Sequence, residues 1–399
     1  MKIVPALLFF LVLFTGTAGA ADQTVYSSGS NSDQITINNA LETVYQSGGG
    51  TVYLKSDNGP FIINGPVYIG SNTILTGAKD AIIKVSKSSS QWFTGRIGII
   101  SCKESLKNVE IYGFQINGNC GNLPASYANT PGHDKDCERC ILLWGDSGNY
   151  AENIKIHDMQ LYDSFSDGIY LFFATNSACY NNFISNCQHE DILWSVVLES
   201  EMYNNQIAGI TSDCMRLDNC VNCKVHENVL FSYDGDNLNG AYPHGENGLQ
   251  VGDAGSSHGY DASNKPTTTT NIEIYGNTFA NNGLAAIAGS GGENVYIHDN
   301  EFVDVSGMTT SRVSFTNPPT KDMSEKIFNS IFDILSLNFT ETENTASEHE
   351  QTQKNVLSVH EAAVKNTEGK LLIPLINLLF SGVVGIFAIG IFKVLKVIL

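Results

Sequence analysis

Short runs of alternating apolar and polar residues recur along the central part of the chain. Four of these runs are variants of one segment: NVEIYGFQ from Asn108, NIKIHDMQ from Asn153, NIEIYGNT from Asn271 and NVYIHDNE from Asn294. Alternation with a period of two predicts short β-strands rather than helices. Polar turns rich in Asn, Asp and Gly separate the runs, so each strand is expected to end in a tight turn.

The repeat has a constant length. An aromatic or His marker recurs at intervals of 23 residues, first at His157, Tyr180, Tyr203 and His226, and then at Tyr275 and His298. A unit of this size is too short for a propeller blade and too polar for a leucine-rich repeat. It fits one coil of a right-handed parallel β-helix, in which coils stack about 4.8 Å apart. We therefore predict an all-β fold, a β-helix over residues 21–308.

The N-terminal part of this domain is expected to close its first coil. Residues 35–47 have the pattern of a short amphipathic helix, and residues 48–54 and 61–85 have the pattern of strands. A helix laid over the first coil would prevent edge-to-edge pairing of its exposed strands.

Both ends of the chain indicate export and anchoring. Residues 1–20 combine one Lys, an apolar stretch and a small-residue ending, as in a signal peptide cut before Ala21. Residues 371–392 are uncharged and long enough to cross a bilayer, and the lysines of the tail, 393–399, place that tail in the cytoplasm. The protein is predicted to be exported to the cell surface and held there by one C-terminal transmembrane helix, with its N-terminus outside.

Residues 309–370 form the predicted connection between the β-helix and this anchor. They lose the strand pattern and are rich in Thr, Glu, Asn and Lys, which is typical of a stalk. Apolar residues between 327 and 335 recur at helical spacing, so a short amphipathic helix is expected to cover the open end of the β-helix.

Composition and charge exclude several classes of protein. Only 16% of the 399 residues are charged, and 37 Gly, 16 Tyr and 20 Phe accompany 10 Pro. This mixture argues against a coiled coil, a helical bundle and a disordered chain. The formal net charge of -19, without a Lys/Arg cluster, argues against a nucleic-acid partner.

Aligning the coils predicts a column of acids. With Ile141, Ile169, Ile192, Met215, Leu249 and Ile287 in one inward column, the position two residues earlier reads Arg139, Asp167, Glu190, Asp213, Asn247 and Ala285. Like charges about 4.8 Å apart repel, unless a cation, a shared proton or a substrate relieves them. Together with the adjacent Asp191, these acids are the candidate catalytic residues; the alternative is an ordinary solvated turn.

Two insertions point to the same edge. They lie near residues 119–138 and 234–246, just before the column position of their coils, and would wall a trough over the acids. Their His133 and His244 are candidate substrate-binding residues at the two ends of this trough.

Four further residues are expected to bind the substrate. Tyr170 and Arg216 come one residue after the inward column, and Arg139 and Asn247 continue the acid column. Arg216 could bind a uronate carboxylate, act as the base of a lyase, or form a salt bridge with a neighbouring acid.

Nine cysteines in an exported chain predict disulfides, with one cysteine left over. Cys120 and Cys137 bracket the first insertion and are the preferred pair. Cys140 and Cys223 belong to two CxxC sequences, but the β-helix places them several coils apart, so a zinc site is not expected.

The chain also resembles a known family. A capping helix, the sequence GGTVYL and Asn-x-x-Ile repeats are similar to the pectate-lyase-like superfamily of β-helical carbohydrate-active proteins. SFSDGIYL (164–171) and ISNCQHEDIL (184–193) resemble two catalytic motifs of polygalacturonases, whereas residues 212–217 and 247–251 depart from the two downstream motifs. A β-helix, a stalk and one span also resemble surface proteins of archaea. The resemblance implies an enzyme acting on a polysaccharide.

Three functions remain open at this point. The first is a glycoside hydrolase acting on an acidic, uronate-containing polysaccharide through the stacked carboxylates. The second is a polysaccharide lyase with Ca²⁺ bound by Asp and Glu and with Arg216 as base; Ca²⁺ is the one cofactor considered. The third is a non-catalytic envelope or adhesion protein.

Overall fold

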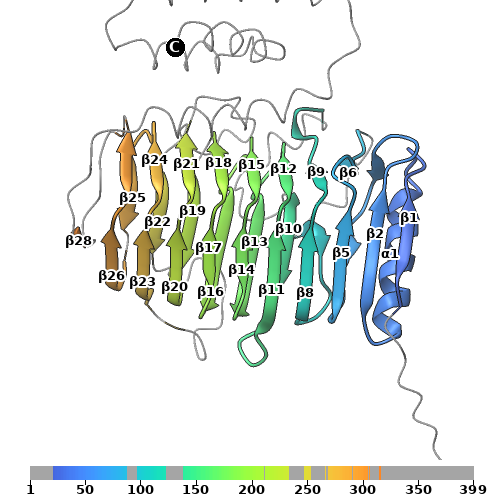
Figure 1. Cartoon of the computed structure of the whole chain (residues 1–399), viewed down its shortest axis with the longest axis horizontal. Coiled ribbons are helices and arrows are strands. Elements are labelled where there is room, and N and C mark those ends of the chain that lie inside the picture. Colours follow the sequence, from blue (N-terminus) through green and yellow to red (C-terminus); the bar gives the residue numbers. More distant parts are fainter. Residues whose placement is uncertain are drawn as a thin grey trace, which may run out of the picture.

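The computed structural model describes residues 21–87, 97–122, 138–210, 212–232, 247–252, 266, 268–289, 291–303, 305 and 314–315. Within these residues the chain forms a parallel β-helix, as predicted. Successive coils lie side by side from the N-terminal helix to the last strand (Figure 1).

Three stacks of parallel strands form the faces of the β-helix. The first stack contains β4 (Val67–Tyr68), β7 (Ile97–Ser101), β10 (Glu138–Trp144), β13 (Ile169–Thr175), β16 (Ile192–Leu198), β19 (Asp213–Asp218), β22 (Asn247–Gly252) and β25 (Ala285–Gly289).

The second stack contains β1 (Gln23–Tyr26), β2 (Gly50–Lys55), β5 (Thr73–Gly77), β8 (Lys107–Tyr112), β11 (Ala151–His157), β14 (Ala178–Tyr180), β17 (Glu201–Tyr203), β20 (Val221–His226), β23 (Thr270–Tyr275), β26 (Glu293–His298) and β28 (Ser314–Phe315).

The third stack contains β3 (Phe61–Ile63), β6 (Ile82–Val85), β9 (Gln115–Asn117), β12 (Gln160–Tyr162), β15 (Phe183–Ser185), β18 (Gln206–Gly209), β21 (Val229–Ser232), β24 (Thr278–Ala280) and β27 (Glu301–Val303). A short 3-10 turn, Cys120–Asn122, follows β9.

The observed register is the one predicted from the repeat. Ile169 pairs with Ile192 and Ile192 with Met215, so these neighbouring coils are offset by 23 residues. Each of these inward side chains is fully buried in the core. Pairing continues to β28, beyond the domain boundary predicted at residue 308.

The single α-helix of the described residues, α1 (Asp33–Gln46), closes the first coil as predicted. It packs against β1 to β4 and buries Ile37, Leu41 and Val44. Asp33 at its start is also buried, where its carboxylate accepts hydrogen bonds from Ser28 and from the backbone N–H of Ile62. The first coil therefore ends under a packed helix rather than as an open edge (Figure 1).

Asparagine side chains stabilise the turns from inside. Asn182, Asn205, Asn228, Asn277 and Asn300 stack on consecutive coils, and each amide nitrogen donates to the next amide oxygen at 2.9–3.0 Å. The same amides bond buried backbone groups of neighbouring coils, such as the carbonyl of Cys179. This ladder satisfies polar backbone groups that would otherwise be buried without partners.

The repeat markers form a second ladder on the outside. The rings of Tyr112, His157, Tyr180, Tyr203, His226, Tyr275 and His298 stack with centroids 4.5–5.2 Å apart and planes within 7°. The marker spacing of the sequence is thus the spacing of a continuous ring stack.

The predicted signal peptide (1–20), most of the stalk and the apolar segment 371–392 lie outside the described residues. Among the residues that are described, no helix is long and apolar enough to cross a bilayer.

The disulfide prediction is also not supported. No disulfide joins any two of the described cysteines, all of which are buried, and Cys137 lies outside the described residues. Cys179 is a core residue, as its inward position predicted. These thiols behave as small apolar side chains.

The asparagine ladder yields a stability prediction. Replacing Asn205 with Ala removes bonds to Asn182, Asn228 and the carbonyl of Cys179 and leaves their polar groups unsatisfied. We expect a loss of about 2–4 kcal/mol in the free energy of unfolding, measured by urea denaturation. The matched control is Asn39→Ala on the exposed face of α1, which should change stability by less than about 0.5 kcal/mol. Equal effects of the two substitutions would contradict the role of the ladder.

Candidate functional site

The predicted acid column lies where the chain bends into the strands of the first stack. Asp167 and Glu190 precede β13 and β16, Asp213 begins β19, and Arg139 and Asn247 occupy the same position on the flanking coils. The structure therefore brings these five predicted residues together. All of them are buried, and the three acids are at most 1% exposed.

The column lies on the outer side of the coil. The Arg139 guanidinium lies over the Tyr170 ring at 5.3 Å, and Tyr170 belongs to an outer apolar cluster with Leu142 and Leu193 that is separate from the main core. Tyr170 points outward as predicted, but it is only 2% exposed.

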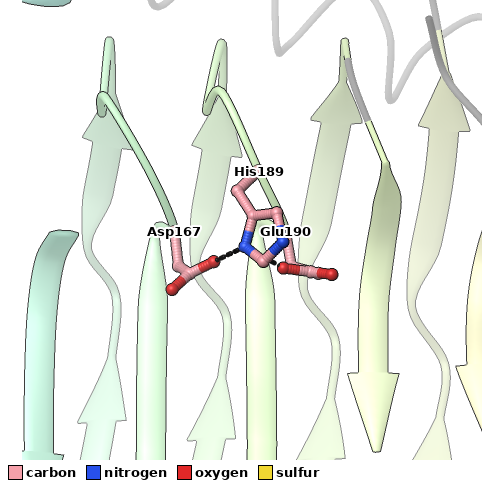
Figure 2. A group of neighbouring side chains, drawn as sticks. All are labelled: Asp167, His189 and Glu190. Carbon is pink, nitrogen blue, oxygen red and sulfur yellow. Dashed lines mark hydrogen bonds and ion pairs between the residues drawn. The ribbon is translucent and has the colours of Figure 1, made fainter. Parts of the chain in front are cut away.

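Asp167 is held between two cationic side chains. Its Oδ2 accepts a hydrogen bond from Nε of Arg139 at 2.5 Å, and its Oδ1 lies 2.5 Å from Nδ1 of His189. Figure 2 shows the imidazole of His189 lying between the carboxylates of Asp167 and Glu190. The next coil thus provides the second cation for Asp167.

Glu190 is held in the same way from its two sides. Its Oε2 is in ionic contact with the same Nδ1 of His189, and its Oε1 accepts from Nη1 of Arg216 at 3.4 Å and from the Ser212 hydroxyl at 3.3 Å. Arg216 in turn places its Nε 3.0 and 3.1 Å from the two oxygens of Asp218.

These contacts form a charge chain, which we define as Arg139, Asp167, His189, Glu190, Arg216 and Asp218. Cations and anions alternate along it, three of each when His189 is protonated. The sequence predicted repulsion within an acid column, with a solvated turn as the alternative. The alternative is wrong, because the acids are buried. The repulsion between the acids is relieved by cationic side chains of the protein itself.

The charge chain fixes protonation states. Burial alone would raise the pKa of Asp167, but the charges of Arg139 and His189 outweigh it and hold this pKa well below its usual range. Burial alone would lower the pKa of His189, but Glu190 and Asp167 raise it to about 10. Asp167 is therefore ionised and His189 is an imidazolium at neutral pH.

Asp213 has a different neighbour. Its Oδ1 accepts a hydrogen bond from the Asn247 amide at 2.6 Å, one coil further along the column. The predicted proximity of Asp213 and Asn247 is therefore confirmed, as a contact between a carboxyl group and a neutral donor.

Asp191, which was predicted to be catalytic together with Glu190, does not share the outer edge with it. Its Oδ2 lies 2.8 Å from the position that a Cβ would take on Gly209, and the Cys187 thiol of the core is one of its polar neighbours. The two acids are adjacent at a bend of the chain, and their side chains point to opposite sides of it.

The environment of Asp191 disfavours a charge. Both oxygens are buried without a hydrogen-bond partner of ordinary geometry among the described residues. Burial raises the pKa of Asp191 well above its usual range; the Cys187 thiol partly offsets this, and the charges of Glu190 and Asp167 add to it. The surroundings of Asp191 thus favour its neutral form.

Asp167, His189 and Glu190 offer three metal-ligating atoms within 4.8 Å of one another. Each carboxylate oxygen of this trio already faces a cationic side chain, and two guanidinium groups lie beside it. An added divalent cation would have to displace the imidazolium proton and would meet the charges of Arg139 and Arg216. The residues present therefore do not favour Ca²⁺ at this position.

Arg216 forms the salt bridge that the sequence analysis gave as the alternative. Burial would lower its pKa, but Asp218, Glu190 and Asp213 outweigh burial and raise this pKa. A guanidinium held protonated by three acids is poorly suited to remove a proton, which weakens the lyase alternative.

Sequence reasoning missed His189 and Asp218. His189 lies in the turn before Glu190, outside the alternating pattern, and the signal that pointed to it was its position beside two acids in QHED. His133, His244 and most of both insertions lie outside the described residues, so the trough they were predicted to form stays a prediction.

Comparison with known proteins agrees with the fold. No protein-family model and no curated protein sequence matches the chain. An exopolygalacturonase from Thermotoga maritima is similar with a TM-score of 0.50 and 14% identity, over 69% of this chain and 70% of that chain. A polygalacturonase from Erwinia carotovora ssp. carotovora gives a TM-score of 0.44 and 13% identity, over 76% and 96%. The first of these likenesses shows the shared parallel β-helix fold.

The inward position of Asp191 yields a prediction on stability and pH. Its pKa is raised on folding, so its ionisation destabilises the folded state increasingly as pH rises above about 4, by about 1.4 kcal/mol per unit up to the folded pKa. We therefore expect the stability of Asp191→Asn relative to wild type to be greater at pH 8 than at pH 4, as measured by urea denaturation.

The matched control is Asp167→Asn, which is expected to lower the stability of the folded state at neutral pH rather than raise it. The pKa of Asp167 is lowered on folding, so its contribution is present at neutral pH and is lost as the pH falls. Its removal takes a buried carboxylate away from Arg139 and His189, and should cost about 3–5 kcal/mol at pH 7. A gain by Asp191→Asn that is the same at pH 4 and pH 8 would refute the buried neutral acid.

Proposed function

We propose that this protein is a glycoside hydrolase that cleaves an acidic, uronate-containing polysaccharide at the outer acid column. The observation that carries this proposal is the stacking of Asp167, Glu190 and Asp213 on three consecutive coils. Hydrolysis of a glycosidic bond needs two carboxyl groups on opposite sides of the bond.

The spacing of the acids supports this chemistry. The facing carboxylate oxygens of Asp167 and Glu190 lie within 4.8 Å of each other, and adjacent coils are about 4.8 Å apart. Retaining enzymes separate their carboxyl groups by about 5 Å, whereas inverting enzymes separate them by about 6.5–9.5 Å. Neighbouring acids of the column thus match retention, while Asp167 and Asp213, two coils apart, lie near the upper limit for inversion.

The neighbours of each acid suggest how the roles divide. Asp167 and Glu190 contact cations, and we assign them the anionic roles of nucleophile or base and of stabilising positive charge on the sugar ring. Asp213 is the remaining acid of the column, and we assign it the role of proton donor to the leaving group. Arg139 and Arg216 place positive charge where a uronate carboxylate would bind.

The burial of the column sets a condition on binding. Because the three acids are at most 1% exposed, the sugar can reach them only if the outer side of the column opens. Substrate binding is therefore expected to involve a conformational change.

We also propose that the protein works at the cell surface. Residues 1–20 would direct its export and residues 371–392 would anchor it, with the stalk holding the β-helix away from the membrane. Its partners would then be an extracellular polysaccharide and the membrane, with no nucleic acid.

A non-catalytic envelope or adhesion role is the second candidate. The observation favouring it is that the cations and anions of the charge chain neutralise one another. A buried network that is paired in this way is able to fix the coil geometry without taking part in catalysis. In that case the β-helix would bind its partner without cleaving it.

The substrate assay distinguishes these functions. Incubation with polygalacturonate and with alginate should release new reducing ends without a product that absorbs in the ultraviolet. An absorbing, unsaturated product would indicate a lyase instead. Binding to a polysaccharide without any cleavage would support the adhesion role.

Substitution of Asp213 tests the assigned chemistry. Asp213→Asn keeps the size of the side chain but cannot donate a proton, so we expect the rate of cleavage to fall by at least about 100-fold with an unchanged melting temperature. The matched control is Glu201→Gln, an exposed acid paired with Lys224 on the second stack, which should retain the wild-type rate. A fully active Asp213→Asn variant would refute this assignment.

A further inference from the structure

His189 has a position that catalysis by the acid column does not explain. Its Nδ1 lies 2.5 Å from Oδ1 of Asp167 and is also in ionic contact with Oε2 of Glu190, yet the side chain is only 4% exposed. One ring nitrogen, with one proton, therefore joins carboxylates that belong to two consecutive coils (Figure 2).

Removal of this proton would leave two buried carboxylates facing each other. Their oxygens lie within 4.8 Å, and like charges at this distance cannot both stay ionised without a cation between them. The outer oxygens are held by Arg139 and Arg216, but those guanidinium groups lie at the two far ends and not between the acids.

We propose that His189 is a positioning residue, whose imidazolium holds Asp167 and Glu190 together as anions and thereby sets the acid limit of cleavage. This inference rests on the proposed hydrolase function, which it deepens by naming how the site is regulated by pH. The elevated pKa of the imidazole, about 10, agrees with a proton that stays in place over the working range.

The other charged groups near the imidazole do not replace it. Arg139 comes from β10, Arg216 and Asp218 from β19, Asp213 from the start of β19, and Asp191 lies on the inner side of its own turn. Arg139 and Arg216 each bind the outer oxygen of one acid, and Arg216 is also shared with Asp218, so neither guanidinium supplies a cation between the two acids.

The pH dependence of cleavage tests this role. In His189→Gln one of the two facing acids must take up a proton, so the acid limb of the kcat profile should move to higher pH by about one to two units. His189→Lys keeps a positive charge and should return the limb toward the wild-type position. A purely structural role would lower the rate at every pH without moving the limb.

The matched control is His157→Gln. His157 also lies between two carboxylates, Asp158 at 2.6 Å and Glu110 at 3.0 Å, but it belongs to the outer ring stack of the second stack. This variant should leave the acid limb where it is. An unmoved limb in His189→Gln, or an equal shift in both variants, would overturn the proposal.

A second readout does not depend on activity. In an NMR titration of the histidine side chains, the His189 signal can be assigned by its absence from His189→Gln and His189→Lys. This signal should stay at the imidazolium position beyond pH 8. Titration of this signal near pH 6.5 would overturn the proposal, because the acids would then lack their cation. If wild type cleaves no polysaccharide, the hydrolase proposal has failed, and the NMR titration alone decides whether His189 binds the two acids as a cation.

Discussion

Parallel backbone hydrogen bonds between successive coils are the interaction on which the rest of this molecule depends. They fix the register between coils, with an offset of 23 residues wherever no insertion intervenes, so that equivalent side chains stand directly above one another. The buried core, the asparagine ladder and the outer ring stack all need this register. A slip of one residue would turn the inward column outward and break all three together.

The same register creates the electrostatic problem at the acid column. It brings Asp167, Glu190 and Asp213 together on neighbouring coils, and burial makes their charges costly. Three cations relieve the repulsion between the acids: Arg139 from the coil before Asp167, His189 from the turn before Glu190, and Arg216 from the coil after Glu190. Buried ion pairs of this kind add little net stability, so their main effect is to fix where each carboxyl group lies and which of them carries a proton.

Much of the fold was predictable because its information is periodic. The marker spacing predicted the coil length and the inward column, and the amphipathic pattern predicted the cap now seen as α1. The periodic alignment also placed Asp167, Glu190 and Asp213 on one edge. Each of these features depends on backbone register, which a repeat in the sequence encodes directly.

The rest of the site could not be predicted, because it depends on the local direction of the chain, which the repeat does not encode. At the bend before β16, Glu190 points outward and Asp191 inward, and an alignment of coils cannot separate two adjacent acids. His189 lies in a turn, where the alternating pattern has ended, so its contact with Asp167 could not be predicted from the repeat. The sequence predicted repulsion among the acids because a salt bridge was only one of the three roles considered for Arg216. The structure shows that Arg216 pairs with Glu190 and Asp218.

The most direct test of this account is a crystal structure of the Glu190→Gln variant soaked with an oligosaccharide of galacturonate. The account predicts that the sugar lies along the outer side of the column, with a glycosidic bond beside residue 190 and Asp213 and with Asp191 out of reach behind the backbone. A sugar bound only elsewhere, for example along the ring stack of Tyr180 and Tyr203, or a glycosidic bond in contact with Asp191, would contradict it.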